Sequence, residues 1–279
     1  MNIKIITDSS ANLLDDNCSG TPHVTVPLTI QVGDQAFKDD KSIDKIEFLT
    51  ALKNTHVKTT TSCPNVHEWL QAFEGGDEIF VFTITSALSG SYNAARQAAN
   101  QYHEDHPEAK ILVFDTRSAG PQVKMLAQKT GELVEEGFSF KEIVKKIEDY
   151  QQHLNLIFAL KDLTNLANNG RVPTAVAKIA GLLKLNIIGE ANNKGEFELI
   201  AKARGDKRCY KKILEEMIKK GYDGGRVQID QNDNAAGAAA IKNVILDKFP
   251  AAKIEIGECR ALCAYYAETG GIMIGYETK

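Results

Sequence analysis

Short apolar runs alternate with amphipathic stretches along the first half of the chain. Three of these runs, 3–7, 79–84 and 111–114, are rich in β-branched and aromatic residues, and a helix-like pattern follows each of them. Continuous apolar runs of this length are typical of parallel strands that are buried on both faces of a sheet. The helical patterns extend to about Tyr102 after the second run and over 122–136 after the third. The first half is therefore predicted to be a three-layer α/β domain with a parallel sheet.

A different kind of segment separates the first two of these units. Residues 24–32 have the pattern of one strand, and an amphipathic helix is predicted for 44–54. The polar stretch 59–64 ends in a proline, which pushes the residue before it toward extended geometry. We therefore expect a loop over 59–64.

The pattern changes after a helix that is predicted for 140–153. The turn sequence Asn-Asn-Lys-Gly at 192–195 lies between two strands and indicates an antiparallel hairpin. Hairpin-paired and parallel strands together predict a mixed-sheet α/β domain, so we expect an N-terminal domain over 1–155 and a C-terminal domain over 156–279. The strands predicted for the second half are 156–160, 185–188, 197–203, 227–229, 254–256 and 271–276, and the helices are 162–169, 175–183, 207–220 and 235–248.

Composition excludes some classes of function but says little more about the fold. Hydrophobic residues make up 43% of the 279 residues and charged residues 25%, a balance typical of soluble globular proteins. The net charge of −4 gives no electrostatic footprint for nucleic acid. No apolar run is long enough to span a bilayer and no signal peptide is recognised, so a cytoplasmic protein without an integral membrane segment is expected. The five scattered cysteines fit reduced thiols.

Motifs for nucleotide binding and for hydrolysis are absent from the sequence. It has no phosphate loop, no dinucleotide-binding glycine fingerprint, no zinc-protease helix and no Gly-x-Ser-x-Gly elbow. The segment 103–106, His-Glu-Asp-His, has metal-capable side chains at helical spacing, but it lies at the polar end of a predicted helix and implies no further ligand. We therefore expect neither a cofactor nor a metal.

Hydroxyl side chains gather where the predicted strands end. Ser86, Ser89 and Ser91 lie between a strand and an Ala-rich helix. A serine there caps the helix or helps the helix amides to bind an anion, and capping is favoured on sequence alone. Both roles can hold together, because one serine can cap the helix while another faces a ligand. The loop 59–62 is likewise either an ordinary polar turn or a ligand contact. Ligands of parallel sheets bind beyond the carboxyl ends of the strands, where these hydroxyls are expected.

Several segments taken together resemble the DegV family, which includes the fatty-acid-binding subunits of bacterial fatty acid kinase. The resemblance covers essentially the whole chain, and it implies two α/β domains with an acyl chain buried between or beneath them. The resemblance also implies that the protein binds a long-chain fatty acid, such as palmitate or oleate, and is not catalytic alone. The segments are Thr7-Asp8-Ser9-Ser10, Thr60-Thr61-Ser62-x-Pro64, Leu88-Ser89-Gly90-Ser91-Tyr92, Leu163-x-Asn165-Leu166 with Gly170-Arg171, and a glycine-rich final strand.

The resemblance also implies roles for particular residues. The threonine and serine that bind the carboxylate in the family correspond to Thr61 and Ser89. An ATP-dependent kinase subunit phosphorylates the bound carboxylate there, and the acyl phosphate serves phospholipid synthesis. Further predicted ligand contacts are Thr60, Ser62, Ser86 and Gly90, and the basic residues that resemble kinase-facing positions are Arg171, Arg204 and Lys207.

The chain departs from the family pattern at two places. Cys63 stands where the family usually has glutamine. The C-terminal His-x-Gly-x-Gly of the family corresponds to 266–270, so Tyr266 is predicted to replace the histidine that contacts the carboxylate. A tyrosine donates a hydrogen bond but carries no positive charge near neutral pH. One alternative is that Tyr266 packs on a helix beside Cys263, away from the ligand. For the function of the whole chain, the alternative is a stand-alone small-molecule kinase or acyl-transfer enzyme of related fold.

Overall fold

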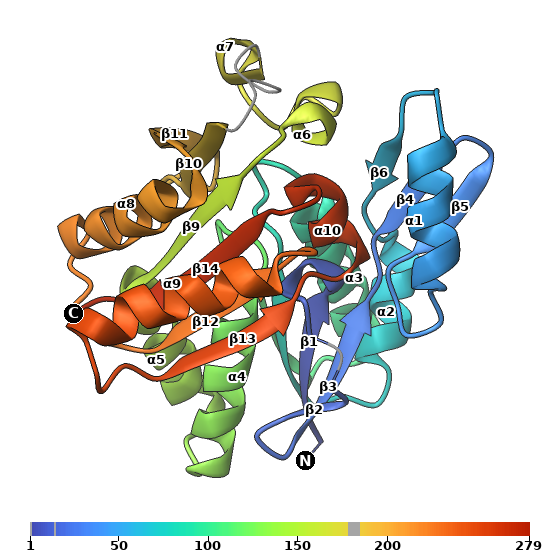
Figure 1. Ribbon diagram of the computed structural model, residues 1–279. Helices are drawn as coiled ribbons and strands as arrows, with labels where there is room; N and C mark the ends of the chain where they lie inside the picture. The colour runs from blue at the N-terminus through green and yellow to red at the C-terminus, as the bar shows by residue number, and fades with distance from the viewer. Residues whose placement is uncertain (1, 14, 178–184) are drawn as a thin grey trace. The chain divides into compact units, whose positions relative to one another are not determined.

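The structure of the protein is a computed structural model that describes residues 2–13, 15–177 and 185–279. The chain divides into two compact units. Unit 1 comprises Met1–Ala119 and Val123–Gln152, and unit 2 comprises Gly120–Gln122 and His153–Lys279. Each unit has a central sheet of its own with helices packed on it (Figure 1).

The main sheet of unit 1 has five strands, of which four run parallel. These strands are β1 (Ile3–Asp8), β2 (Asn17–Cys18), β3 (Thr21–Val26), β7 (Glu78–Thr83) and β8 (Lys110–Asp115). Their order is β2-β3-β1-β7-β8, and the two-residue β2 is antiparallel to β3. Every residue of β7 is buried, as a strand covered on both faces requires. The parallel sheet predicted for this half is confirmed.

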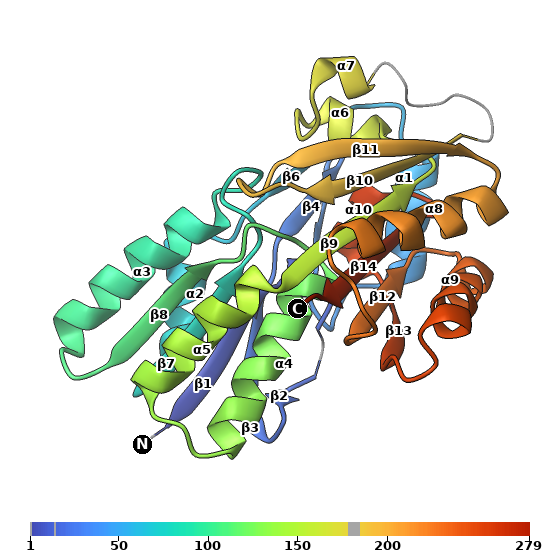
Figure 2. The ribbon, with the colours of Figure 1, turned by 90° about the vertical axis from the view of Figure 1, so that its left-hand side faces the viewer.

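Helices cover both faces of this sheet and give unit 1 its three layers (Figure 2). The helices are α2 (Val66–Phe73), α3 (Ser91–Asp105), α4 (Pro121–Glu135) and α5 (Phe140–Gln152). On one face, Trp69 of α2 and Ala95 of α3 pack in a core with Val81. On the other face, the ring of Phe140 stacks on Phe80 with centroids 4.7 Å apart. Both faces of the sheet are thus closed by apolar side chains.

A three-stranded antiparallel sheet completes unit 1, and two predictions are wrong there. It contains β4 (Thr29–Val32), β5 (Gln35–Lys38) and β6 (Thr60–Ser62) in the order β5-β4-β6, and α1 (Lys45–Asn54) follows β5. The strand predicted over 24–32 is two strands in different sheets, because Pro27 has no amide hydrogen and interrupts the ladder. The loop predicted over 59–64 contains β6, because the edge of β4 offers its backbone to these β-branched residues.

Unit 2 is built on a mixed six-stranded sheet, as predicted. Its strands are β9 (Leu154–Leu160), β10 (Leu185–Ala191), β11 (Phe197–Arg204), β12 (Val227–Gln231), β13 (Ile254–Glu258) and β14 (Ile272–Glu277). The order is β11-β10-β9-β14-β12-β13, with β12 and β13 parallel and the other neighbours antiparallel. Gly195 has φ +78° in the turn between β10 and β11, which confirms the predicted hairpin.

Two long helices cover one face of this sheet (Figure 1). The helices of unit 2 are α6 (Thr164–Asn168), α7 (Thr174–Ala177), α8 (Asp206–Lys219), α9 (Ala235–Lys248) and α10 (Ala261–Ala267). Ile213 of α8 and Ile241 of α9 pack on the sheet. Residues 178–183 of the helix predicted over 175–183 lie outside the described residues. No helix in the described ranges is both long and apolar enough to cross a membrane.

Candidate functional site

The carboxylate of Asp8 lies at the carboxyl end of β1 and is fully buried. Its Oδ1 accepts hydrogen bonds from the backbone N–H of Ser10 at 3.2 Å and from the Ser10 hydroxyl at 2.5 Å. Its Oδ2 accepts from the backbone N–H of Ile84 at 2.9 Å and from the Ser91 hydroxyl at 2.6 Å. Burial raises the pKa of Asp8 above its ordinary value, and these hydrogen bonds oppose that rise. One side chain therefore joins the ends of β1 and β7 to the start of α3.

The serines in the loop between β7 and α3 have different partners. The Ser91 hydroxyl is bonded to Asp8, and the Ser91 backbone N–H donates to Oγ of Ser89 at 3.2 Å. The Ser86 hydroxyl and backbone N–H both donate to Asp115. The half-buried Ser89 hydroxyl has no acceptor for its own proton within the part of the chain that the structure describes. It is therefore the serine whose hydroxyl can donate to a ligand.

The N-cap position of α3 is occupied by Gly90, which has no side chain to cap the helix. A serine hydroxyl still satisfies one amide of the first turn, because Oγ of Ser89 accepts the backbone N–H of Ser91, the first residue of α3. The Ser91 hydroxyl takes no part in capping, because it donates to the buried Asp8 carboxylate. The predicted capping by a serine is thus made from the position before the N-cap, and the bond to Asp8 also orients the first turn.

The strand that carries Thr61 lies beside this serine loop. A Cβ atom placed on Gly90 would come within 3.1 Å of Sγ of Cys63, so the two segments approach closely. Gly90 has an ordinary φ of −75°, so the close approach of Cys63, and not the torsion angle, favours glycine at this position. Thr61 is half-buried, whereas Thr60 and Ser62 are exposed. The structure thus brings the two predicted hydroxyl segments together at one edge of unit 1.

Tyr266 lies on α10 in unit 2 and is half-buried. Its ring packs edge-to-face against Tyr265, with the centroids 4.8 Å apart. The Tyr265 hydroxyl accepts a hydrogen bond from the Asn169 side chain at 2.9 Å, which ties α10 to the segment after α6. Tyr266 is therefore on a helix, as one of the alternatives had it, and its contact with a ligand head group stays a prediction.

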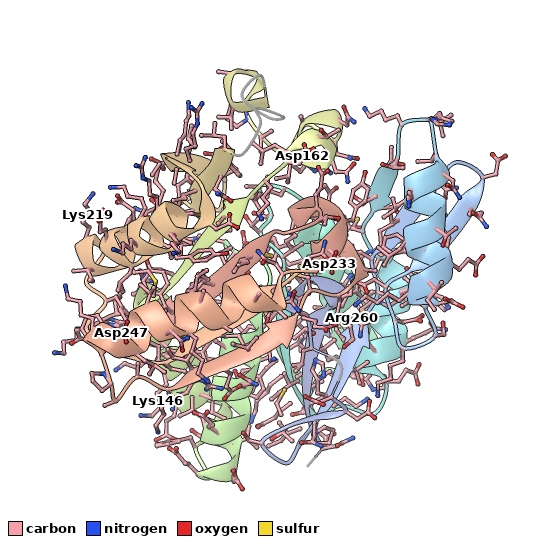
Figure 3. All side chains as sticks on the ribbon, viewed as in Figure 1. Lys146, Asp162, Lys219, Asp233, Asp247 and Arg260 are labelled. Carbon is pink, nitrogen blue, oxygen red and sulfur yellow. The ribbon has the colours of Figure 1, made fainter. Side chains whose placement is uncertain are left out.

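Glu268 follows α10 and fastens it to α6. Its carboxylate accepts the backbone N–H of Asn165 at 2.8 Å, at the positive end of that short helix. Asp162, which is labelled in Figure 3, accepts the backbone N–H of Thr164 at 2.8 Å at the start of the same helix. Burial raises the pKa of Glu268 to about 7, Asp162 adds to the rise, and the amides of Asn165 and Thr164 oppose it. The sequence assigns no role to Asp8 or Glu268, because the partners Ile84, Ser91 and Asn165 are distant from them along the chain.

The predicted basic residues lie in unit 2. Arg204 ends β11 and Lys207 lies in the first turn of α8, and both are exposed on either side of the turn at Gly205. Arg171 is half-buried, and its guanidinium donates to the backbone carbonyl of Asn169. Arg204 and Lys207 thus lie on the two sides of one turn, while Arg171 lies in the turn after α6.

The remaining candidate features are the metal-capable segment 103–106 and two hollows of the surface. Within the described residues, no cluster of three or more His, Cys, Asp or Glu side chains is arranged to hold a metal. His106 of the predicted metal-capable segment packs its ring against Tyr102 at 4.2 Å. Two surface hollows of about 460 and 470 Å³ border α1, and both are lined by Gln35 and Glu47. The predicted ligand contacts line neither of these hollows.

Comparison with known proteins decides the family. Residues 2–279 match the family model described as "Uncharacterised protein, DegV family". The chain belongs to the DegV family. A DegV domain-containing protein of Streptococcus pneumoniae is 41% identical to it over 279 residues, which cover 99% of each chain.

Two solved structures of DegV proteins have nearly the same fold. The Streptococcus pneumoniae fatty acid kinase (Fak) B3 protein, loaded with linoleic acid, has a TM-score of 0.97 and 40% identity, with full coverage of both chains. A DegV family protein from Eubacterium eligens, loaded with heptadecanoic acid, has a TM-score of 0.96 and 38% identity, with 99% of this chain and 100% of that chain covered. The predicted family and fold class are confirmed.

Proposed function

We propose that this DegV protein binds a long-chain fatty acid, such as palmitate or oleate, and presents the carboxylate to an ATP-dependent kinase subunit. The observation that carries the proposal is 40% identity over the whole chain to a fatty acid kinase B3 protein loaded with linoleic acid. The Eubacterium eligens protein loaded with heptadecanoic acid supports the binding step. In this proposal the chain supplies the binding surface, and the partner supplies the nucleotide chemistry that forms the acyl phosphate.

The head group requires hydrogen-bond donors. A carboxylate taken out of water without partners costs several kcal/mol, so the site must offer hydroxyls or amides. We assign Ser89 to this role because its proton has no acceptor within the described residues. Thr61 is assigned with it because its strand lies beside the same loop. Thr60, Ser62 and Gly90 belong to the surroundings of this pair, whereas Ser86 is bonded to Asp115 and supports the loop.

The tail accounts for most of the affinity. A sixteen-carbon chain contains about fourteen methylenes, which at ~0.8 kcal/mol each gives on the order of 11 kcal/mol of transfer free energy. Association costs of ~4–15 kcal/mol offset much of this gain. The tail must therefore be largely buried, and the hydroxyls serve to orient the carboxylate more than to increase affinity.

We assign the docking of the kinase subunit to the predicted basic residues of unit 2. Arg204 and Lys207 are exposed cations at a turn, where long side chains keep their freedom to meet an acidic surface. Arg171 is assigned to the same role with part of its guanidinium already bonded to Asn169. These residues would steer the kinase subunit toward the loaded protein.

The test of the proposed function has two stages. Mass spectrometry of lipid extracted from the purified protein is expected to find one long-chain fatty acid per chain. Incubation of the loaded protein with ATP and a cognate kinase subunit is expected to yield acyl phosphate, and omission of the subunit is expected to abolish it. Acyl phosphate formed without the subunit would make the chain a stand-alone kinase. Failure to carry or take up oleate would refute the proposal.

Tyr266 provides a separate test of the head-group site. If its hydroxyl donates to the bound carboxylate, Tyr266→Phe should weaken oleate binding at least several-fold, because a hydrogen bond contributes ~0.5–1.5 kcal/mol between neutral groups and roughly 1.5–3 kcal/mol to a charged one. Tyr266→His should at least preserve the affinity. Displacement of a fluorescent fatty acid measures both variants, and an unchanged affinity for Tyr266→Phe would leave the head group to Thr61, Ser89 and the backbone amides.

A further inference from the structure

The geometry points to Asp8 as a positioning residue that sets the orientation of the Ser89 hydroxyl toward the fatty-acid carboxylate. This inference rests on the proposed function and adds to it a residue that does not itself meet the ligand. The Asp8 side chain is fully buried. An ionised carboxylate only accepts hydrogen bonds, and its two oxygens already accept from four donors. Asp8 therefore acts through its neighbours.

One oxygen of Asp8 holds both ends of the serine loop. Oδ2 accepts from the backbone N–H of Ile84, which immediately precedes the loop 85–90, and from the hydroxyl of Ser91, which immediately follows it. A loop whose two ends are bonded to the same buried atom keeps a fixed span. The other oxygen is bonded twice to Ser10, so the carboxylate is itself held in place.

Ser91 connects Asp8 to the Ser89 hydroxyl that meets the ligand. The Ser91 side chain points its proton at Asp8, and the Ser91 backbone N–H donates to Oγ of Ser89 at 3.2 Å. That bond occupies one lone pair of Ser89 and leaves its proton to be donated. A hydroxyl oriented before the ligand arrives loses less freedom on binding than a freely rotating one. Removal of the Asp8 charge should therefore affect recognition of the carboxylate more than recognition of the tail.

The experiment compares two ligands that share one tail. Affinities for oleate and for oleyl alcohol are measured in the full-length chain, and the oleate preference is the ratio of the two. A general loss of packing changes both affinities together, whereas loss of positioning changes the ratio. Asp8→Asn keeps the shape of the side chain, and Ser91→Ala removes the link between Asp8 and the loop. Glu78→Gln is the matched control, because Glu78 is also buried on the same sheet but pairs with Lys110 at the start of β7.

The expected result is a decrease of about tenfold in the oleate preference of Asp8→Asn and Ser91→Ala, the size of one hydrogen bond to a charged group. The preference of Glu78→Gln should stay at the wild-type value. If Asp8→Asn does not fold, Ser91→Ala decides alone. An unchanged or increased preference in the folded variants would overturn the inference while leaving fatty-acid binding intact. A wild-type protein that does not bind oleate would overturn the proposed function itself.

Discussion

The contact between Gly90 and Cys63 leads to a prediction about how the two hydroxyl segments depend on each other. A Cβ atom on Gly90 would lie 3.1 Å from Sγ of Cys63, so Gly90→Ala forces the thiol to retreat by a few tenths of an ångström. Overpacking of this kind typically costs ~1–3 kcal/mol. Since Cys63 is only half-buried, its side chain can give way, and we expect the lower end, about 1 kcal/mol.

The clash is isolated by a double-mutant cycle. In a Cys63→Ala background the facing sulfur is gone, so Gly90→Ala should lose that cost. Alanine is also a poorer helix N-cap than glycine, but this effect is present in both backgrounds and cancels. The coupling between the two substitutions should therefore be about 1 kcal/mol.

Urea unfolding of the four proteins measures the free energies for this cycle, and oleate binding is followed in parallel. Gly90→Ala alone should weaken oleate binding, because the added methyl occupies space between the serine loop and the Cys63 thiol next to the Thr61 strand, and Cys63→Ala should restore the binding. If the effects of the two substitutions on the free energy of unfolding are additive within ~0.3–0.5 kcal/mol, the methyl group at position 90 does not clash with the Cys63 thiol.

Three further outcomes are expected. Ser89→Ala should weaken oleate binding clearly, while Ser86→Ala should weaken it much less, because the Ser86 hydroxyl is bonded to Asp115; equal losses in a displacement titration would contradict this assignment. Arg204→Glu should lower kinase-dependent acyl-phosphate formation without a change in melting temperature, whereas Lys248→Glu, the same charge change at the end of α9, should not. The folded protein holds the Glu268 proton more tightly than the unfolded chain, with a pKa of about 7 against 4.5. The free energy of unfolding should therefore fall as the pH rises through this range, and Glu268→Gln should remove that part of the pH dependence in urea titrations.

Local patterns were sufficient to predict most of the fold. The buried strand β7 is apolar along nearly its whole length, and the turn at Gly195 needs a positive φ, so both are encoded within a few neighbouring residues. The error at Pro27 has the opposite origin. The residues on either side of it have similar apolar character, and the different sheets that they join are set by partners far along the chain.

The candidate site was predictable in its residue types and not in its connections. The hydroxyls of Thr61 and Ser89 stand out in sequence, but the proximity of their segments follows from the Gly90–Cys63 approach, which no local pattern encodes. The bond from Ser91 to Asp8 spans 83 residues and makes the Ser91 hydroxyl unavailable to the helix amides. Such a bond depends on the parallel pairing of β1 and β7, so it becomes visible when that pairing is known.

The short strand β6 has a consequence for how ligand binding could be observed. It has three residues, and it is hydrogen-bonded to β4 at the edge of a three-stranded sheet. Amide hydrogens in such an edge strand exchange with solvent through local opening, at a far lower free energy than global unfolding, whereas those of the central β1 exchange much more slowly. A ligand held by Thr61 would stabilise the closed form of β6. Occupancy would therefore be recorded as slower deuterium uptake at 60–62, without any label on the fatty acid.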